Sequence, residues 1–147
     1  MKTNVQNVFR AQFTAKSVNE SWARQTVSAF VAQLDPEVVE IADIRTAVSE
    51  AVTNAIVHGY KNEGGTVYLT VSYTYDRIIT IAVRDKGCGI DDVRAAMQPL
   101  FTTDTTGERG GMGFTIMKSF TDKLRVTSRL GKGTLVTMTK RLSSGDR

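Results

Sequence analysis

Three short segments, which follow one another in a fixed order, constrain this chain more than any other feature of its sequence. They read Glu-Ala-Val-Thr-Asn-Ala at residues 50–55, Asp-Lys-Gly-Cys-Gly-Ile at residues 85–90 and Gly-Glu-Arg-Gly-Gly-Met-Gly-Phe at residues 107–114. Each pattern is common by itself. Together, in this order and within 147 residues, they are difficult to explain by chance.

The spacing of apolar residues predicts helices combined with a mostly antiparallel sheet. Helices are expected at about residues 17–34, 35–57, 91–97 and 114–120, and strands at 8–13, 66–75, 78–85, 124–129 and 134–141. A capping box at residues 17–20 would open the first helix, and Asp35 followed by Pro36 would open the second. This order predicts an α+β fold, a two-layer sandwich that forms one domain over residues 1–147.

Composition excludes several classes of protein. The formal net charge of +4 comes from scattered Lys and Arg, which gives no argument for nucleic-acid binding. One cysteine, Cys88, and one histidine, His58, make a zinc site improbable, so that any metal is expected to be a hard cation on oxygen ligands. No apolar run reaches the roughly 18 residues of a membrane span, and no signal peptide is recognisable, so we expect a cytoplasmic protein with no membrane partner.

The first segment places polar side chains along one stripe of the second predicted helix. Glu50, Asn54 and His58 follow one another at intervals of four residues, next to the apolar stripe. An amide oxygen at Asn54 can coordinate Mg²⁺, while the Glu50 carboxylate can accept a proton from an attacking hydroxyl group. A solvated polar helix face is the simpler explanation of this stripe when it is considered alone.

The second segment follows a predicted buried strand. Asp85 has the same phase as Ile81 and Val83, so its carboxylate should point toward the core, where it needs a donor from the protein or from a ligand. Gly87 and Gly89 would let the backbone approach a flat ring, which favours a ligand. An ordinary turn after a strand is the alternative.

The third segment places Gly110, Gly111 and Gly113 just before a predicted helix. Backbone N–H groups at such a position can bind an anion, and Arg109 can donate to two phosphate oxygens. In isolation, a flexible helix-entry loop explains the glycines equally well. In combination with the other two segments, phosphate binding is the better explanation.

These segments resemble the N box (Glu50 to Asn54), the first glycine box (Asp85 to Gly89) and the second glycine box (Gly111 to Gly113) of the Bergerat-fold (GHKL) ATPase family. The longer runs at residues 49–60, 98–103 and 111–117 are similar to the anti-sigma F factors of spore-forming bacteria, and the similarity extends over nearly the whole chain. The resemblance implies a cytoplasmic, dimeric protein-serine kinase that uses ATP and Mg²⁺ and also binds ADP. It would hold the sporulation sigma factor F inactive and phosphorylate a serine of its anti-anti-sigma factor.

The resemblance also implies a role for individual residues. Glu50 would be the general base, Asn54 the Mg²⁺ ligand and Asp85 the reader of adenine. The other implied nucleotide contacts are Gly87 and Gly89 in the base pocket, Thr102 and Thr103 in the lid, Arg109, Gly110, Gly111, Met112 and Gly113 at the phosphates, and Thr134 near adenine. For Thr134, an ordinary strand residue is an equal alternative.

Glu20 and Arg24 match positions that in this family contact the sigma factor and the anti-anti-sigma factor. A surface ion pair between residues four apart is the alternative. The sequence departs from the family pattern at residues 104–107, where Asp-Thr-Thr-Gly replaces a more charged stretch of the lid.

Three other functions fit parts of this pattern. The catalytic domain of a sensor histidine kinase fits poorly, because His58 lies on the nucleotide helix and not on a separate phosphoacceptor helix. An ATP-gated binding module without catalysis would use the same boxes, although the presence of Glu50 argues against it. A stress-response anti-sigma kinase would differ mainly in its partner.

Overall fold

The structure is a computed structural model that describes residues 4–98 and 110–143, with the side chains of residues 110–112 left out. Within these residues, five strands form one sheet in the order β1-β2-β3-β5-β4, and every neighbouring pair is antiparallel. The strands are β1 (Val5–Thr14), β2 (Thr66–Thr74), β3 (Ile78–Asp85), β4 (Lys123–Arg129) and β5 (Gly133–Arg141). This sheet confirms the predicted α+β sandwich.

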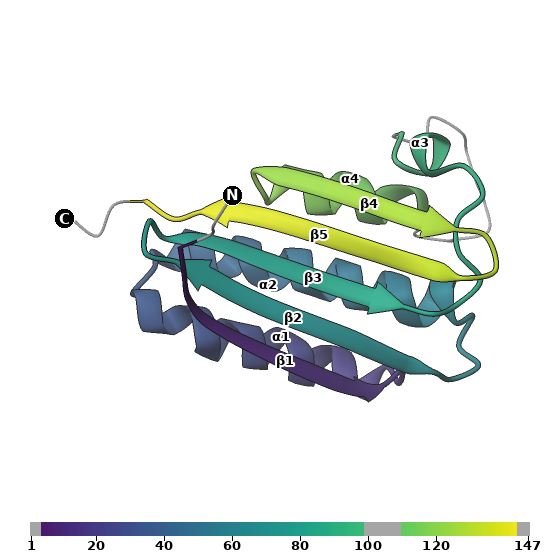
Figure 1. The fold of residues 1–147 in the computed structure, drawn as a ribbon, viewed down its shortest axis with the longest axis horizontal. Helices are drawn as coiled ribbons and strands as arrows, with labels where there is room; N and C mark the ends of the chain where they lie inside the picture. Colours follow the sequence, from purple (N-terminus) through teal and green to yellow (C-terminus); the bar gives the residue numbers. More distant parts are fainter. Residues whose placement is uncertain (1–3, 99–109, 144–147) are drawn as a thin grey trace.

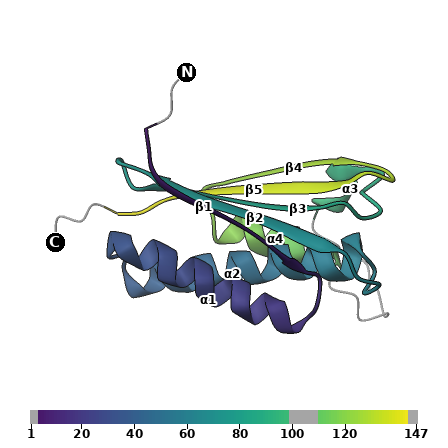
Figure 2. The same cartoon turned by 60° about the horizontal axis from the view of Figure 1, so that its bottom comes forward.

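The longer helices cover one face of the sheet and leave the other face open, and one short helix lies beside the edge strand β4 (Figures 1 and 2). The helices are α1 (Val18–Val31), the 3₁₀ segment η1 (Ala32–Leu34), α2 (Val38–Thr53), the π-helical segment η2 (Asn54–Gly59), α3 (Val93–Ala96) and α4 (Gly110–Ser119). Helix α2 packs between α1 and α4. Among the described residues, no helix has the length and apolar character needed to cross a bilayer.

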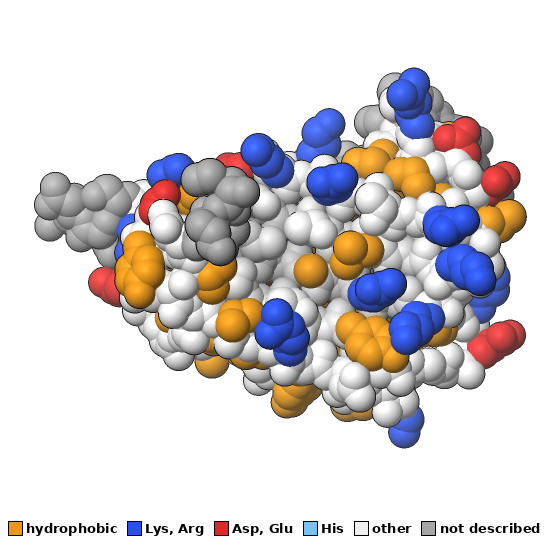
Figure 3. All heavy atoms as spheres, in the orientation of Figure 1, with side chains coloured by type: hydrophobic (Ala, Val, Ile, Leu, Met, Phe, Trp, Pro, Cys, Tyr) orange, Lys and Arg blue, Asp and Glu red, His pale blue; other side chains and the backbone are white. Residues whose placement is uncertain are grey.

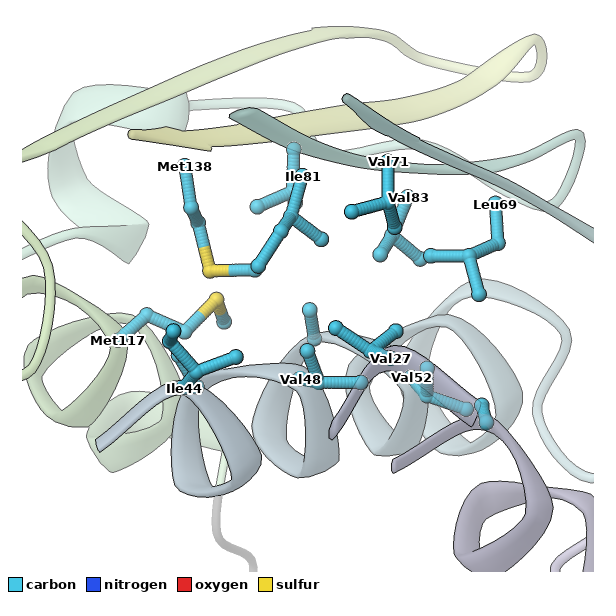
Figure 4. Packing of buried hydrophobic residues seen from close by; sticks show 14 of the residues in the cluster. Val27, Ile44, Val48, Val52, Leu69, Val71, Ile81, Val83, Met117 and Met138 are labelled. Atoms are coloured by element: carbon cyan, nitrogen blue, oxygen red, sulfur yellow. The ribbon is translucent and has the colours of Figure 1, made fainter. Parts of the chain in front are cut away.

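The core lies between the sheet and the helices (Figure 4). Alternate residues of β2 and β3 point inward, as the period of two predicts, and the apolar stripes of the helices meet them. The labelled side chains come from α1 (Val27), α2 (Ile44, Val48, Val52), β2 (Leu69, Val71), β3 (Ile81, Val83), α4 (Met117) and β5 (Met138), and all of them are buried.

The open face of the sheet gathers basic side chains that are scattered in the sequence (Figure 3). Arg10, Arg84, Arg125 and Arg129 all lie at exposed strand positions. Asp85 is the only acidic residue in the five strands, and it is buried. The carboxylate at the end of β3 is therefore exceptional in this sheet.

The two helix starts differ from the prediction. Ser17 has helical backbone angles and makes no side-chain cap, and the Glu20 side chain pairs with Arg24. Asp35 is not an N-cap: it has a left-handed backbone (φ 52°) at the end of η1, where the chain reverses between antiparallel helices. Helix α2 begins three residues later, where the Glu40 carboxylate accepts a hydrogen bond from the Glu37 N–H (2.9 Å).

The long helix also ends differently from the prediction. Its α-helical part stops at Thr53, and the next turn is π-helical, so that the Tyr60 N–H reaches the Ala55 carbonyl (2.9 Å). The Gly59 carbonyl leaves the helix and accepts a hydrogen bond from the Cys88 N–H (2.9 Å). Such π turns are rare and are often found at functional sites.

Three smaller boundaries differ as well. Strand β1 begins at Val5, α3 has only four residues, and α4 begins at Gly110 and not at Phe114. The glycines of the third segment therefore form the first turn of a helix, where the backbone N–H groups have no partner within that helix.

Candidate nucleotide-binding site

The candidate site lies where the end of α2 meets the end of β3. Asn54 is 9% exposed at the junction of α2 and η2, and Asp85 is 3% exposed at the last position of β3. Segment η2 packs against β3, so the N box and the first glycine box are neighbours in space although they are about 30 residues apart in sequence. The fold therefore brings the first two sequence segments to one place.

Burial shifts the pKa of the Asp85 carboxyl group. Loss of solvent raises the pKa of its carboxyl group above the ordinary value, although the N–H groups of Gly87 and Thr134 act in the opposite direction. The Gly87 N–H donates to Oδ1 of Asp85 over 2.9 Å. A carboxylate held in this way can accept further hydrogen bonds from a ligand that donates, such as an exocyclic amino group.

The Asp85 carboxyl group lies directly against Gly59. A Cβ placed on Gly59 would come within 2.7 Å of the carboxyl carbon and of both of its oxygens. The sequence suggested Gly59 only as the end of a helix, whereas the structure makes it part of the wall around Asp85.

Gly87 is enclosed by backbone, which leads to a stability prediction. A Cβ at this position would lie 2.0 Å from the Gly59 carbonyl oxygen, so Gly87→Ala forces η2 and the β3 end apart. We expect Gly87→Ala to destabilise the fold by about 3 kcal/mol, which lowers the Tm by about 6–12 °C in a thermal melt. Gly113→Ala is the control, because its Cβ would meet ordinary contacts of 3.6 Å or more. Equal melting of the two variants would contradict this account.

Glu50 lies beside the first turn of α4. A Cβ on Gly113 would be 3.6 Å from Oε1 of Glu50, so the carboxylate and the second glycine box are in contact range. Glu50 is partly buried on α2, one helical turn before Asn54. The structure thus brings the candidate base, the candidate metal ligand and the helix start to one end of the molecule.

A hydroxyl network that the sequence did not reveal surrounds Thr134. Ser128 on β4 donates to the Gly133 carbonyl (2.9 Å) and accepts from the Ile90 N–H (2.8 Å). The Thr134 hydroxyl lies 2.8 Å from the Ser128 hydroxyl, so the two hydroxyl groups share a hydrogen bond. Thr134 also pairs with Asp85 across β3 and β5, so it lies beside the candidate adenine-reading carboxylate.

Tyr60 is a second residue that the sequence analysis missed. Its hydroxyl accepts a hydrogen bond from the Lys86 N–H (2.7 Å) and donates to the Thr66 carbonyl (2.6 Å). It therefore ties the first glycine box to the start of β2. No local pattern in the sequence distinguishes this tyrosine from an ordinary core residue.

Several predicted residues belong to the second glycine box and the lid. Thr102, Thr103 and Arg109 lie outside the described residues, and for Gly110, Gly111 and Met112 only their position in the first turn of α4 is described. The Gly89 backbone has a positive φ of 76° and lies against the Arg129 carbonyl, so it supports the turn after β3. The nucleotide contacts of these residues stay predictions.

Glu20 and Arg24 form the ion pair that was the alternative prediction for them. Nε of Arg24 lies 2.9 Å from Oε2 of Glu20, and both side chains are partly exposed. Such a pair contributes only about 0.3–0.5 kcal/mol. Arg24 also lines a groove that ends at Glu50, so the pair lies near the candidate site.

Residues 4–98 and 110–143 contain no cluster of three or more His, Cys, Asp and Glu side chains that could hold a metal ion. In this part of the chain, therefore, the protein does not supply a complete set of metal ligands. A site with one amide oxygen from Asn54 suits Mg²⁺, which keeps water and phosphate oxygens as its other ligands. The donor set therefore fits a metal that arrives together with a nucleotide.

Comparison with known proteins agrees with this geometry. The sequence matches the family described as Histidine kinase-like ATPase domain over residues 13–140. It is 56% identical over 138 residues to the Anti-sigma F factor of Thermoanaerobacter sp. (strain X514), covering 94% of this chain and 96% of that protein. It is 53% identical over 140 residues to the Anti-sigma F factor of Bacillus licheniformis, covering 95% of each.

Two solved structures share the fold. The RsbU and RsbW domains of a Mycobacterium tuberculosis protein match with a TM-score of 0.61 at 23% identity, over 93% of this chain and 32% of that one. A blue-light activated histidine kinase of Erythrobacter litoralis matches with a TM-score of 0.58 at 22% identity, over 82% of this chain and 41% of that one. The chain belongs to the histidine kinase-like ATPase family, and within that family it belongs with the anti-sigma F factors. Membership implies nucleotide binding and supports an anti-sigma kinase role.

Proposed function

We propose that the protein is an ATP-dependent protein-serine kinase and anti-sigma factor. It holds the sporulation sigma factor F inactive in its Mg-ATP form, and it inactivates its anti-anti-sigma factor by phosphorylating a serine. The observation that best supports transfer, and not only binding, is the position of the Glu50 carboxylate beside Gly113 at the start of α4. A carboxylate there lies next to the place where a helix N-terminus would hold phosphate.

The phosphate end of the site would combine a base, a metal ligand and anion donors. Bound Mg-ATP supplies the phosphoryl group and much of the neutralising charge. Glu50 accepts the proton of the serine hydroxyl, whose oxygen bonds to the γ-phosphorus as ADP leaves. Asn54 offers its amide oxygen to Mg²⁺, Arg109 and the N–H groups of residues 110–113 hold the phosphates, and Thr102 and Thr103 contribute to the lid.

The base end would read adenine. The Asp85 carboxylate accepts a hydrogen bond from the exocyclic amino group, Gly87 and Gly89 leave room for the flat ring, and Thr134 offers its hydroxyl oxygen nearby. Guanine carries a carbonyl oxygen where adenine carries that amino group, so an ionised Asp85 repels it. ADP would occupy the same base and metal subsites.

The experiment that tests the proposal is transfer of labelled phosphate from Mg-ATP to the anti-anti-sigma protein of the same organism. We expect label on one serine of that protein, together with ATP-dependent capture of the sigma factor. Nucleotide binding without transfer would instead support an ATP-gated binding module. Capture of a different, stress-response sigma factor would change the partner but not the chemistry.

We further propose that the functional unit is a cytoplasmic homodimer of this single ATP-binding domain, with Glu20 and Arg24 at the partner surface. Neither nucleic acid nor a membrane is a direct partner in this proposal. Sedimentation velocity at micromolar concentration, with Mg-ATP, should give twice the mass of one chain. A single species with the mass of one chain at all concentrations would contradict the dimer.

A further inference from the structure

A groove of about 510 Å³ runs along the outer side of α2, next to α1. Its apolar lining comes from Val38, Ile41 and Ala42, which lie at the start of α2, and its far end is formed by Ser49 and Glu50. Twelve residues separate the two ends, so the groove extends about 18 Å along the helix. All of its lining residues belong to the described part of the chain.

The apolar end of the groove is uncovered. Val38 is 88% exposed and the adjacent Val39 is 60% exposed, although both lie on a helix whose other side is packed into the core. Exposed single valines are ordinary, but here Val38 adjoins a concave surface that Ile41 continues. A partner segment could bury these side chains together.

Three charged side chains line the groove, namely Arg24, Arg45 and, at its far end, Glu50. Arg24 is paired with Glu20, whereas the Arg45 guanidinium reaches only the Ser28 hydroxyl (3.3 Å) and forms no ion pair with a carboxylate in the described parts of the chain. Asp43, two residues before Arg45 in the sequence, pairs instead with Lys140 on β5 (3.5 Å). Arg45 is thus a cation in the middle of the groove that is available to an acidic group.

We propose that this groove binds the segment of the protein substrate that carries the phosphoacceptor serine, an inference that rests on the proposed kinase function. The segment lies along α2 with apolar residues over Val38 and Ile41 and an acidic residue at Arg45. Its serine then lies at the Glu50 end, where the groove meets the candidate base. Arg45 is a positioning residue, because it binds the substrate protein one helical turn away from the reacting atoms.

The test is steady-state transfer of phosphate to the anti-anti-sigma protein by Arg45→Glu. We expect the KM for the protein substrate to rise at least about tenfold, because an attraction becomes a repulsion, with kcat and ATP affinity within about twofold of the wild type. The KM of the wild type should also rise with added NaCl, and that of Arg45→Glu should not. Arg45→Lys should restore most of the wild-type KM.

Controls separate docking from folding and from the kinase proposal. Lys118→Glu makes the same charge reversal at an exposed position of α4, on the other side of α2, and should leave the KM unchanged. If Arg45→Glu fails to fold, Arg45→Gln provides a neutral side chain of similar length. An unchanged KM in a variant that melts like the wild type would overturn the groove assignment while leaving the kinase intact. Weaker sigma-factor capture with an unchanged KM would also overturn it, and a wild type that transfers no phosphate would refute the kinase itself.

Discussion

Replacement of Glu50 by glutamine should reduce phosphate transfer to the protein substrate by about 100- to 10,000-fold, the range that a general base contributes. Glutamine keeps the size of the side chain and its contact with Gly113, but it cannot take the proton of the serine hydroxyl. ATP affinity should stay within about threefold of the wild type, because binding of the adenine ring and of the phosphates depends on other groups. Single-turnover transfer and nucleotide titration, measured on the same preparation, check the two halves of this prediction.

A matched control is Glu63→Gln, which makes the same chemical change at an exposed position of the turn before β2. It should transfer phosphate at the wild-type rate. Loss of ATP binding together with transfer in Glu50→Gln would show that Glu50 supports nucleotide binding and would refute its role as the base. Undiminished transfer would mean that another group accepts the proton.

Replacement of Asp85 by asparagine should weaken ATP binding by about 100-fold. The change removes a charge-assisted hydrogen bond from the adenine amino group. It can also turn the asparagine NH₂ group toward that amino group, which is itself a donor. The two effects together should cost about 3 kcal/mol of binding free energy. The variant should also lose most of its preference for ATP over GTP, because the carboxylate no longer repels the guanine carbonyl. Isothermal titration with both nucleotides measures the two effects.

The wild type should bind ATP more weakly as the pH is lowered, and the raised pKa of Asp85 moves this loss to a higher pH than for an exposed aspartate. Only the ionised carboxylate is a pure acceptor, so protonation removes the match to adenine. In the nucleotide-free protein the sign is opposite: the contribution of Asp85 to stability is full below its unfolded pKa and is lost as the pH rises through the raised folded pKa. Asp85→Asn should lack both dependences, whereas Asp91→Asn, at an exposed position six residues later, should retain them.

A pH-independent ATP affinity in the wild type would contradict the assignment of Asp85. So would an Asp85→Asn variant that binds ATP as the wild type does. The Gly87 N–H donates to Oδ1 of Asp85, so an asparagine at this position should keep its amide oxygen toward Gly87. Its NH₂ group then faces the ligand, and the predicted loss of ATP affinity tests the role of Asp85.

Much of the architecture follows from local pattern. Alternation in β2 and β3 and the apolar stripe of α2 repeat with the period of one element, so the sequence by itself determined the layers, the inward phase of Asp85 and the side of the helix that carries Glu50 and Asn54. The residue types in the three segments also indicate which chemistry each segment can support. The family could therefore be inferred without any tertiary contact.

Only the tertiary structure decided the features that join segments distant along the chain. The π turn at η2, the contact of Gly59 with Asp85, the Tyr60 bridge to Lys86 and the Ser128 network all depend on atoms from different elements that meet after packing. The start of α2 was mispredicted for the same reason, since the chain reverses between α1 and α2 at Asp35. At the start of α1 the difference is local, because Ser17 is itself helical and Glu20 pairs with Arg24 in the same helix. Periodicity can be recognised from residues that are close in sequence. These contacts, by contrast, form only when the helices pack against the sheet.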